Sequence, residues 1–193
     1  MPQKSEETPA AIRMTDSEDP EGGERMRIEI RPMQTEDEIR GKAYVHWKSW
    51  QETYPGLIDQ SRLDAMTVEK CEKLAFRFPE STLIAKDGAR VIGFSAYGPC
   101  RDDDLPDTGE VVAIYVLSEY WDSGAGPALM QAALERLDFP QTAVWVLKGN
   151  GRAIRFYEKY GFRFDGCEKA LAPGSTAAEL RMIRNRPAEE ETK

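Results

Sequence analysis

The feature that most constrains the fold is a strand, a glycine turn and a helix that follow one another within residues 109–130. Residues 110–117 form an apolar run after Glu110, which is typical of a strand covered on both faces. Gly124 and Gly126 interrupt this run, and apolar residues recur at helical spacing after Pro127. Because the first N–H groups of a helix lack partners within it, this turn is suited to holding a phosphate.

A second strand and helix follow directly along the chain. Residues 142–147 are predicted to form another buried strand. Asn150 is placed to cap a helix over residues 153–160, and Gly161 is placed to end that helix in the left-handed region. Phe162 then opens a further strand. The sequence thus predicts two successive strand-helix units.

The two units together carry a resemblance to a known family. A Gly-x-Gly turn, a helix that contains Phe156 and Tyr157, and then the sequence Tyr-Gly-Phe, in this order, resemble the GNAT superfamily of acyl-CoA-dependent N-acyltransferases. The resemblance covers residues 26–186 and implies an α/β (α+β) fold. That fold has a central, mixed, twisted sheet of about six to seven strands, flanked by about four helices. Its two central parallel strands splay apart.

The remaining segments fit this element order. The predicted elements are a strand over 27–31, helices over 35–50 and 68–78, a hairpin of strands 82–85 and 91–97, and a last strand over 179–183. Thr35 and Glu38 are predicted to form a capping box at the start of the first helix. Residues 1–25 are acidic and poor in large apolar groups, so we expect a disordered tail there. Residues 187–193 are expected to form a C-terminal tail. The sequence leaves open whether translation starts at Met1 or Met26.

Composition excludes several classes of function. Of the formal charge of −8, residues 1–25 carry −4 and residues 187–193 carry −2, so the body carries only −2. No basic surface for nucleic acid is therefore expected. No apolar run is long enough to span a bilayer, and the first residues do not resemble a secretory signal, so we expect a cytoplasmic protein without membrane contact. Three scattered cysteines and the single His46 favour neither disulfides, nor a metal site, nor a Ser-His-Asp triad.

The resemblance implies acetyl-CoA as cosubstrate, bound between the strands over 110–117 and 142–147. The residues expected to contact it are Ile114, Tyr115 and Val116 for the pantetheine arm, Trp121, Asp122, Ser123, Gly124, Ala125, Gly126, Pro127 and Ala128 at the pyrophosphate, and Asn150, Phe156 and Tyr157 from the second helix. The turn departs from the family pattern, since residues 121–127 contain no cation and Pro127 offers no N–H group. An ordinary strand-helix turn is the alternative interpretation.

Catalytic roles also follow from the resemblance. Tyr157 matches the family tyrosine that protonates the departing CoA thiolate, and an ordinary phenol is protonated at neutral pH. Glu110, at the start of the central strand, is the candidate general base that takes the proton of the amine. Each has a structural alternative, because Tyr157 also suits the core and Glu110 also suits an exposed strand end. Asn150 is equally explained as a helix cap alone.

Two further groups bear on the acceptor. Trp50 and Tyr54 are candidates for the wall of the acceptor pocket, although plain core packing explains their helical spacing as well. Four aspartates at 102, 103, 104 and 107 either attract a cationic acceptor or form a solvated loop.

The sequence therefore predicts an N-acetyltransferase that moves an acetyl group from acetyl-CoA to a primary amine by direct attack, without a metal. The acceptor is a small-molecule or peptide amine, and a homodimer is one compatible assembly. The alternatives are a non-catalytic acyl-CoA-binding or interaction protein of the same fold and, more remotely, an unrelated nucleotide-binding module.

Overall fold

The computed structural model describes residues 12–13, 27–77 and 79–187. Its strands are β1 (Ile12–Arg13), β2 (Ile28–Pro32), β3 (Thr82–Asp87), β4 (Arg90–Pro99), β5 (Thr108–Val116), β6 (Gln141–Leu147), β7 (Arg163–Ala170) and β8 (Ala178–Asn185). Its helices are α1 (Glu36–Thr53), α2 (Gln60–Asp64), α3 (Val68–Arg77), α4 (Ala125–Arg136) and α5 (Gly151–Lys159), with a 3₁₀ turn at Ser118–Tyr120. Over these residues no helix is both long and apolar enough to cross a membrane.

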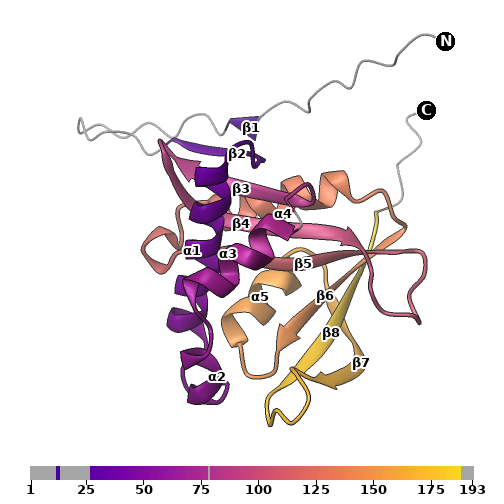
Figure 1. The fold of residues 1–193 in the computed structure, drawn as a ribbon. Coiled ribbons are helices and arrows are strands. Elements are labelled where there is room, and N and C mark those ends of the chain that lie inside the picture. The colour runs from indigo at the N-terminus through magenta and orange to yellow at the C-terminus, as the bar shows by residue number, and fades with distance from the viewer. Residues whose placement is uncertain (1–11, 14–26, 78, 188–193) are drawn as a thin grey trace, which may run out of the picture.

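The strands form one mixed sheet in the order β1-β2-β3-β4-β5-β6-β8-β7 (Figure 1). β5 and β6 run parallel, whereas the other neighbouring strands are antiparallel. The predicted α/β fold is confirmed, with two additions, the short helix α2 and the two-residue strand β1. β1 pairs with β2 inside the segment predicted to be a disordered tail, and the rest of that segment lies outside the described residues, as do residues 188–193 of the predicted C-terminal tail.

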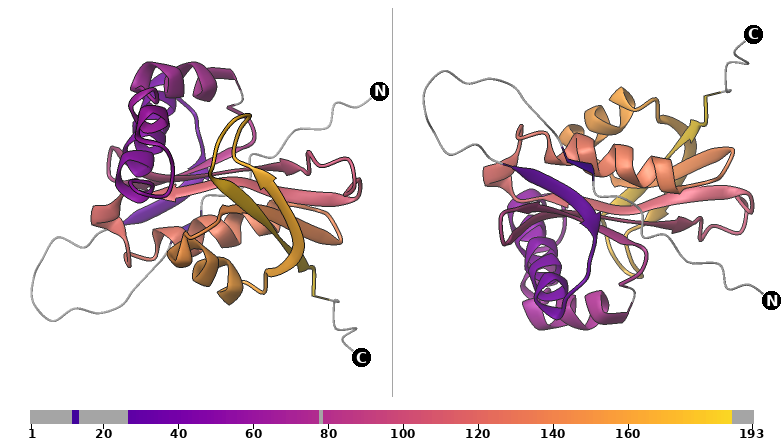
Figure 2. Two further views of the ribbon diagram at one scale, coloured as in Figure 1. Left: turned by 90° about the horizontal axis from the view of Figure 1, so that it is seen from below. Right: turned by 90° about the horizontal axis from the view of Figure 1, so that it is seen from above.

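The helices cover the two faces of the sheet (Figure 2). Helices α1, α2 and α3 lie on one face, which we call the α1 face, and α4 and α5 lie on the other, the α4 face. Thr35 caps α1, because its hydroxyl accepts the N–H of Glu38. The carboxylate of Glu38 accepts the N–H of Gln34 at 2.8 Å and also pairs with Arg31, instead of closing the predicted capping box.

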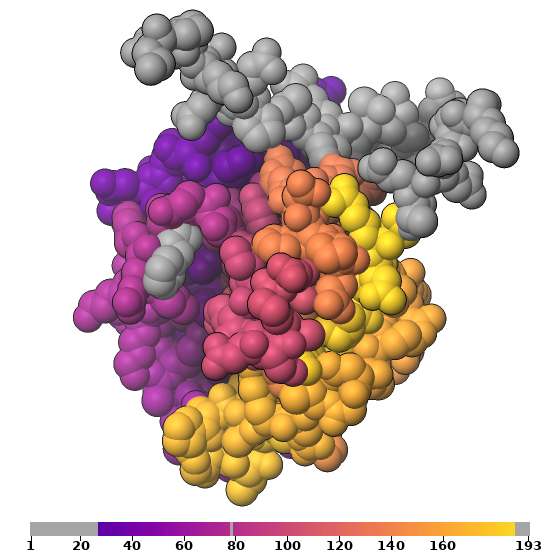
Figure 3. Space-filling model, turned by 90° about the vertical axis from the view of Figure 1, so that its right-hand side faces the viewer, coloured from indigo at the N-terminus to yellow at the C-terminus, as the bar shows by residue number. Residues whose placement is uncertain are grey.

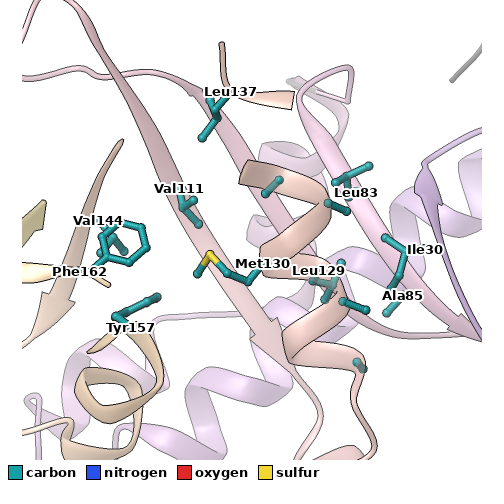
Figure 4. Close-up of a cluster of buried hydrophobic side chains, with 14 of the residues drawn as sticks. Ile30, Leu83, Ala85, Val111, Leu129, Met130, Leu137, Val144, Tyr157 and Phe162 are labelled. Carbon is teal, nitrogen blue, oxygen red and sulfur yellow. The ribbon is translucent and has the colours of Figure 1, made fainter. Parts of the chain in front are cut away.

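The larger apolar core lies on the α4 face. There the inward side of α4, with Leu129 and Met130, packs against Val111, and Tyr157 and Phe162 lie close by (Figure 4). Phe162, Leu129 and Met130 are completely buried. Burial of apolar side chains at this density fixes α4 and α5 on the sheet, and so fixes the turns that precede them.

The parallel strands β5 and β6 pair over only part of their length. Their register runs from Thr108 opposite Gln141 to Val111 opposite Val144, and no pairing follows beyond that point. At the same point β5 contains a bulge, because Ala96 and Tyr97 of β4 face Ala113 and Val111, which leaves Val112 as an extra residue. A bulge bends a strand and increases its twist. The bend carries the end of β5 away from β6, which is the predicted splay.

Candidate functional site

A cavity of about 640 Å³ opens where β5 and β6 part. It is lined by the diverging ends of both strands, by the turn before α4, by α5, by the end of α1 and by one residue of β8. Elements of both faces contribute, so the cavity passes through the sheet at the gap between the two strands. Backbone groups of β5 beyond Val111 have no β6 partner there, and a ligand in the gap can supply one.

The glycine turn presents free N–H groups to the cavity. Gly124 caps α4 at a φ of +87°, a conformation that favours glycine. Ser123 Oγ accepts the N–H of Ala125 at 3.3 Å. The N–H groups of Gly124 and Gly126 make no hydrogen bond with any described residue, and both residues line the cavity. Free N–H groups at a helix N-terminus are suited to an anion, and binding of a phosphate at this turn stays a prediction.

Arg152 supplies a cation beside this turn, although the turn itself contains none. Its guanidinium carbon lies 3.6 Å from the ring centroid of Trp121, and it forms no ion pair with a described residue. The indole N–H of Trp121 donates to the carbonyl oxygen of Val116 at 3.0 Å, which fixes the ring at the end of β5. Trp121 thus connects the turn to Arg152. Arg152 was not predicted from the sequence, because a whole helix and strand separate it from the turn along the chain.

Helix α5 places an aromatic pair along the cavity. Asn150 caps the helix by accepting the N–H of Ala153 at 3.1 Å. Phe156 faces Gly126, since a Cβ added at that glycine would lie 3.7 Å from the ring. Tyr157 is buried yet lines the cavity, and its hydroxyl makes no hydrogen bond with the described residues. Burial raises the pKa of Tyr157, so its hydroxyl stays protonated at neutral pH and above.

An aromatic network from α1 forms the opposite wall. The indole N–H of Trp50 donates to the hydroxyl oxygen of Tyr115 at 3.0 Å, and the hydroxyls of Tyr54 and Tyr115 lie 3.0 Å apart. His46 stacks on Tyr115 at 5.5 Å between ring centroids. Burial raises the pKa of Tyr54 and of Tyr115. Tyr54 and Tyr115 line the cavity, whereas Trp50 lies behind them and positions Tyr115.

Glu110 does not line the cavity. Its side chain is 1% exposed and lies in the part of β5 that pairs with β6. Arg101 holds both carboxylate oxygens, with Nη2 to Oε1 at 2.7 Å and Nε to Oε2 at 2.9 Å. The role of Glu110 as general base remains a prediction, and these contacts give the carboxylate a structural partner instead of access to a ligand.

Besides Asp122 at the glycine turn, Glu179 is a carboxylate that lines the cavity. It lies in β8 directly opposite Leu147 of β6, and its carboxylate makes no hydrogen bond or ion pair with any described residue. Burial raises the pKa of Glu179, while Lys169 and Arg101 oppose that shift. Nothing in the sequence pointed to Glu179 as a cavity residue, because a single glutamate in a terminal strand is usually a solvated side chain.

The acidic loop between β4 and β5 is docked on the sheet. Arg181 of β8 binds Asp104 through two hydrogen bonds of 2.8 and 2.7 Å, and it also binds Asp102 and Asp165. Figure 3 shows this loop against the strands β7 and β8. Asp103 and Asp107 are exposed. The loop is therefore held by an internal arginine at two of its four aspartates and is solvated at the other two.

The structure brings most of the predicted cofactor residues together. Those that line the cavity are Ile114, Tyr115, Val116, Trp121, Asp122, Gly124, Gly126, Pro127, Asn150, Phe156 and Tyr157. Ser123, Ala125 and Ala128 lie in the same turn but do not line the cavity, and the two alanines are buried. Of the predicted acceptor residues, Tyr54 lines the cavity and Trp50 does not.

Comparisons with known proteins agree with this architecture. The profile of the acetyltransferase (GNAT) family matches residues 43–162. The uncharacterized N-acetyltransferase YuaI of Bacillus subtilis is 34% identical over 138 residues, which span 69% of this chain and 79% of that protein. The probable N-acetyltransferase Rv2775 of Mycobacterium tuberculosis is 29% identical over 130 residues, which span 64% and 74%.

Solved structures share the fold at low sequence identity. A PaiA N-acetyltransferase from Thermoplasma acidophilum, in complex with coenzyme A, superposes with a TM-score of 0.64 at 21% identity, over 83% of this chain and all of that one. The protein PH1933 from Pyrococcus horikoshii superposes with a TM-score of 0.67 at 16% identity, over 82% of this chain and 98% of that one.

Proposed function

The chain belongs to the acetyltransferase (GNAT) family of acyltransferases, and on that premise we propose that it transfers the acetyl group of acetyl-CoA to a primary amine. One observation carries the proposal. The free N–H groups of Gly124 and Gly126 face a cavity that continues through the gap between β5 and β6 to Tyr157. A ligand with a phosphate at one end and a thioester at the other fits that arrangement.

The residues of the cavity suit each part of acetyl-CoA. Gly124, Gly126 and the N-terminus of α4 offer N–H donors and a positive dipole to a pyrophosphate, and Arg152 adds a charge. The unpaired edge of β5 beyond Val111 offers backbone groups to the amides of a pantetheine arm. Acetyl-CoA supplies an activated acyl group, so the protein needs only to position it and manage protons.

Tyr157 is proposed to protonate the thiolate that leaves. Its hydroxyl lines the cavity and is free of other hydrogen bonds among the described residues. Because burial raises the pKa of Tyr157, the phenol carries its proton at neutral pH and has one to donate as the C–S bond breaks. The acceptor amine attacks the thioester directly, with no covalent intermediate on the protein.

Two measurements test this proposal. Acetyl-CoA and CoA should raise the melting temperature, whereas ATP and NAD should not, because only a ligand that binds the native state stabilises it. Release of free thiol from acetyl-CoA should then depend on an added primary amine. Failure of CoA to shift the transition at millimolar concentration would refute the cofactor assignment. Binding of CoA without turnover on any amine would favour a non-catalytic acyl-CoA-binding protein.

A further inference from the structure

The end of the cavity on the α1 face differs from the end at the glycine turn. It is lined by Tyr54, Tyr115, Trp145, Leu147 and Glu179. Leu147 and Glu179 are directly paired across β6 and β8, so their side chains share one face of the sheet. Leu147 packs with Ile58 and Leu63 near α2, which identifies that face as the α1 face. This end therefore combines aromatic walls with one carboxylate.

Glu179 is the carboxylate in its neighbourhood that lacks a cation. Arg101 is paired with Glu110, and Arg181 is paired with three aspartates. Lys169 lies directly opposite Glu179 on β7, but its ammonium lies 3.6 Å from the centroid of the Trp145 ring and 3.8 Å from Asp102. A half-buried carboxylate without a partner is costly, so a cation brought by a ligand gains energy here.

The cationic side chains that line the cavity are not at its α1 end. They are Arg152 and Lys159, and both belong to α5 on the opposite face. An anionic acceptor therefore finds no matching charge at the α1 end. A cationic acceptor finds Glu179 together with the rings of Tyr54 and Tyr115, which attract a cation through their faces.

From this juxtaposition, and resting on the proposed function, we infer that the α1 end of the cavity binds the acceptor as a primary ammonium, and that Glu179 holds the ammonium and takes its proton. Glu179 thus takes the role of general base that the family resemblance implied for Glu110. Tyr54 and Tyr115 form the walls that exclude water and fix the nitrogen, and Trp50 acts through Tyr115 as a positioning residue.

The proton and bond changes balance with these two residues. The ammonium gives one proton to Glu179, and the freed lone pair on nitrogen forms the C–N bond to the acetyl carbon while the C–S bond breaks. The sulfur takes the electron pair of that bond and a proton from Tyr157. The second proton lost by the nitrogen restores Tyr157. Glu179 passes the first proton to solvent, so each turnover yields an amide, a thiol and one released proton.

The first test measures how tightly amines bind to the CoA-loaded protein, before any turnover is measured. The CoA-loaded protein is titrated with three amines, 2-phenylethylamine, butylamine and glycinamide, and with their hydroxyl counterparts, 2-phenylethanol, butanol and glycolamide. Since each pair differs only in the charged group, at least one amine should bind about ten-fold or more tightly than its alcohol. No amine preference in the wild-type protein would overturn the inference.

Glu179→Gln should remove that preference and still bind CoA. With an amine that is a substrate, kcat/KM should fall about 10²- to 10⁴-fold, while the KM for acetyl-CoA stays the same. Glu179→Asp keeps the charge, so it should retain part of the preference for the amine. This second variant also tests the inference if Glu179→Gln does not fold. Glu168→Gln is the matched control, because Glu168 lies in the neighbouring strand, pairs with Lys148 and does not line the cavity.

The outcomes separate the two proposals. If CoA does not bind the wild-type protein, the proposed function fails. If CoA binds and amines are acetylated, but Glu179→Gln keeps the full amine preference, only the inference about the acceptor end is wrong.

Discussion

β5 and β6 run parallel along a shared boundary, the seam, whose two halves have opposite properties. In the closed half, residues 108–111 pair with residues 141–144, and the buried carboxylate of Glu110 is held by Arg101. In the open half, beyond Val111 and Val144, the strands part around a cavity. There Glu179 and the hydroxyl of Tyr157 have no protein partner among the described residues.

The contrast separates groups that stabilise the fold from groups that remain available to ligands. A buried polar group that finds its partner within the chain adds stability and offers nothing to a substrate. A buried polar group without a partner costs stability unless a ligand completes it. We therefore expect substitutions in the open half to change binding and turnover, and substitutions in the closed half to change the free energy of unfolding.

The largest effect is expected at Tyr157 in the open half. Tyr157→Phe keeps the ring in the core but removes the proton donor, so kcat should fall about 10²- to 10⁴-fold at saturating substrates. Because burial raises the pKa of Tyr157, wild-type turnover should show no loss from ionisation of this group between pH 7 and about 10. Tyr97→Phe is the control, since Tyr97 lies outside the cavity lining. An unchanged kcat in folded, CoA-loaded Tyr157→Phe would contradict the assignment, provided product release does not limit the rate.

The next effect is expected at the glycine turn. Gly126→Glu places a carboxylate beside the pyrophosphate, and two charges about 4–5 Å apart repel by about 3–4 kcal/mol in a partly screened site, so the Kd for CoA should rise more than about 100-fold. Gly126→Ala is the matched control, because its Cβ meets the Phe156 ring at an ordinary contact distance of 3.7 Å. Calorimetric titration with CoA measures both. Equal affinity in the two variants would place the phosphate elsewhere.

A smaller and different effect is expected in the closed half. Glu110→Gln removes a buried charge from its arginine, so the free energy of unfolding in urea should fall by about 1–3 kcal/mol. Since Arg101 is 64% exposed, water solvates it after the change and limits the loss. Turnover per folded molecule should stay close to that of the wild type. A large loss of kcat at unchanged stability would instead support Glu110 as the general base.

The smallest effect is expected at Arg152. Its charge lies at the surface beside Trp121, so Arg152→Gln should weaken CoA binding about 3- to 10-fold, and less at high salt. Arg155→Gln is the control, because Arg155 lies on the same helix, is exposed and does not line the cavity. If the two variants bind CoA equally well, Arg152 is not the cation that the turn lacks.

The predictions from sequence were most accurate where the signal is local. Asn150 caps α5, Thr35 caps α1, and Gly161 takes the left-handed conformation after α5. Each of these depends on hydrogen bonds or steric limits within a few residues. The short helix α2 was missed, because its five residues carry no sustained periodicity.

The faces of β5 could not be predicted from alternation. Strict alternation places Glu110 on the side of Ile114 and Val116, but in the structure Val111 joins those two residues in the core of the α4 face. Ala113 and Tyr115 face the other cluster. The bulge at Val112 causes this change, because one extra residue reverses the side on which all preceding side chains lie.

By itself the sequence determined the two strand-helix units, their caps and the glycine turn, because these follow from the spacing of apolar residues and from glycine at positions that need it. Only the tertiary structure decided which charged groups meet the cavity. It brings Arg152 to Trp121, holds Glu110 against Arg101, and leaves Glu179 open beside Tyr115. These placements depend on the pairing of strands far apart in the chain and on one bulge. Neither leaves a local trace in the sequence.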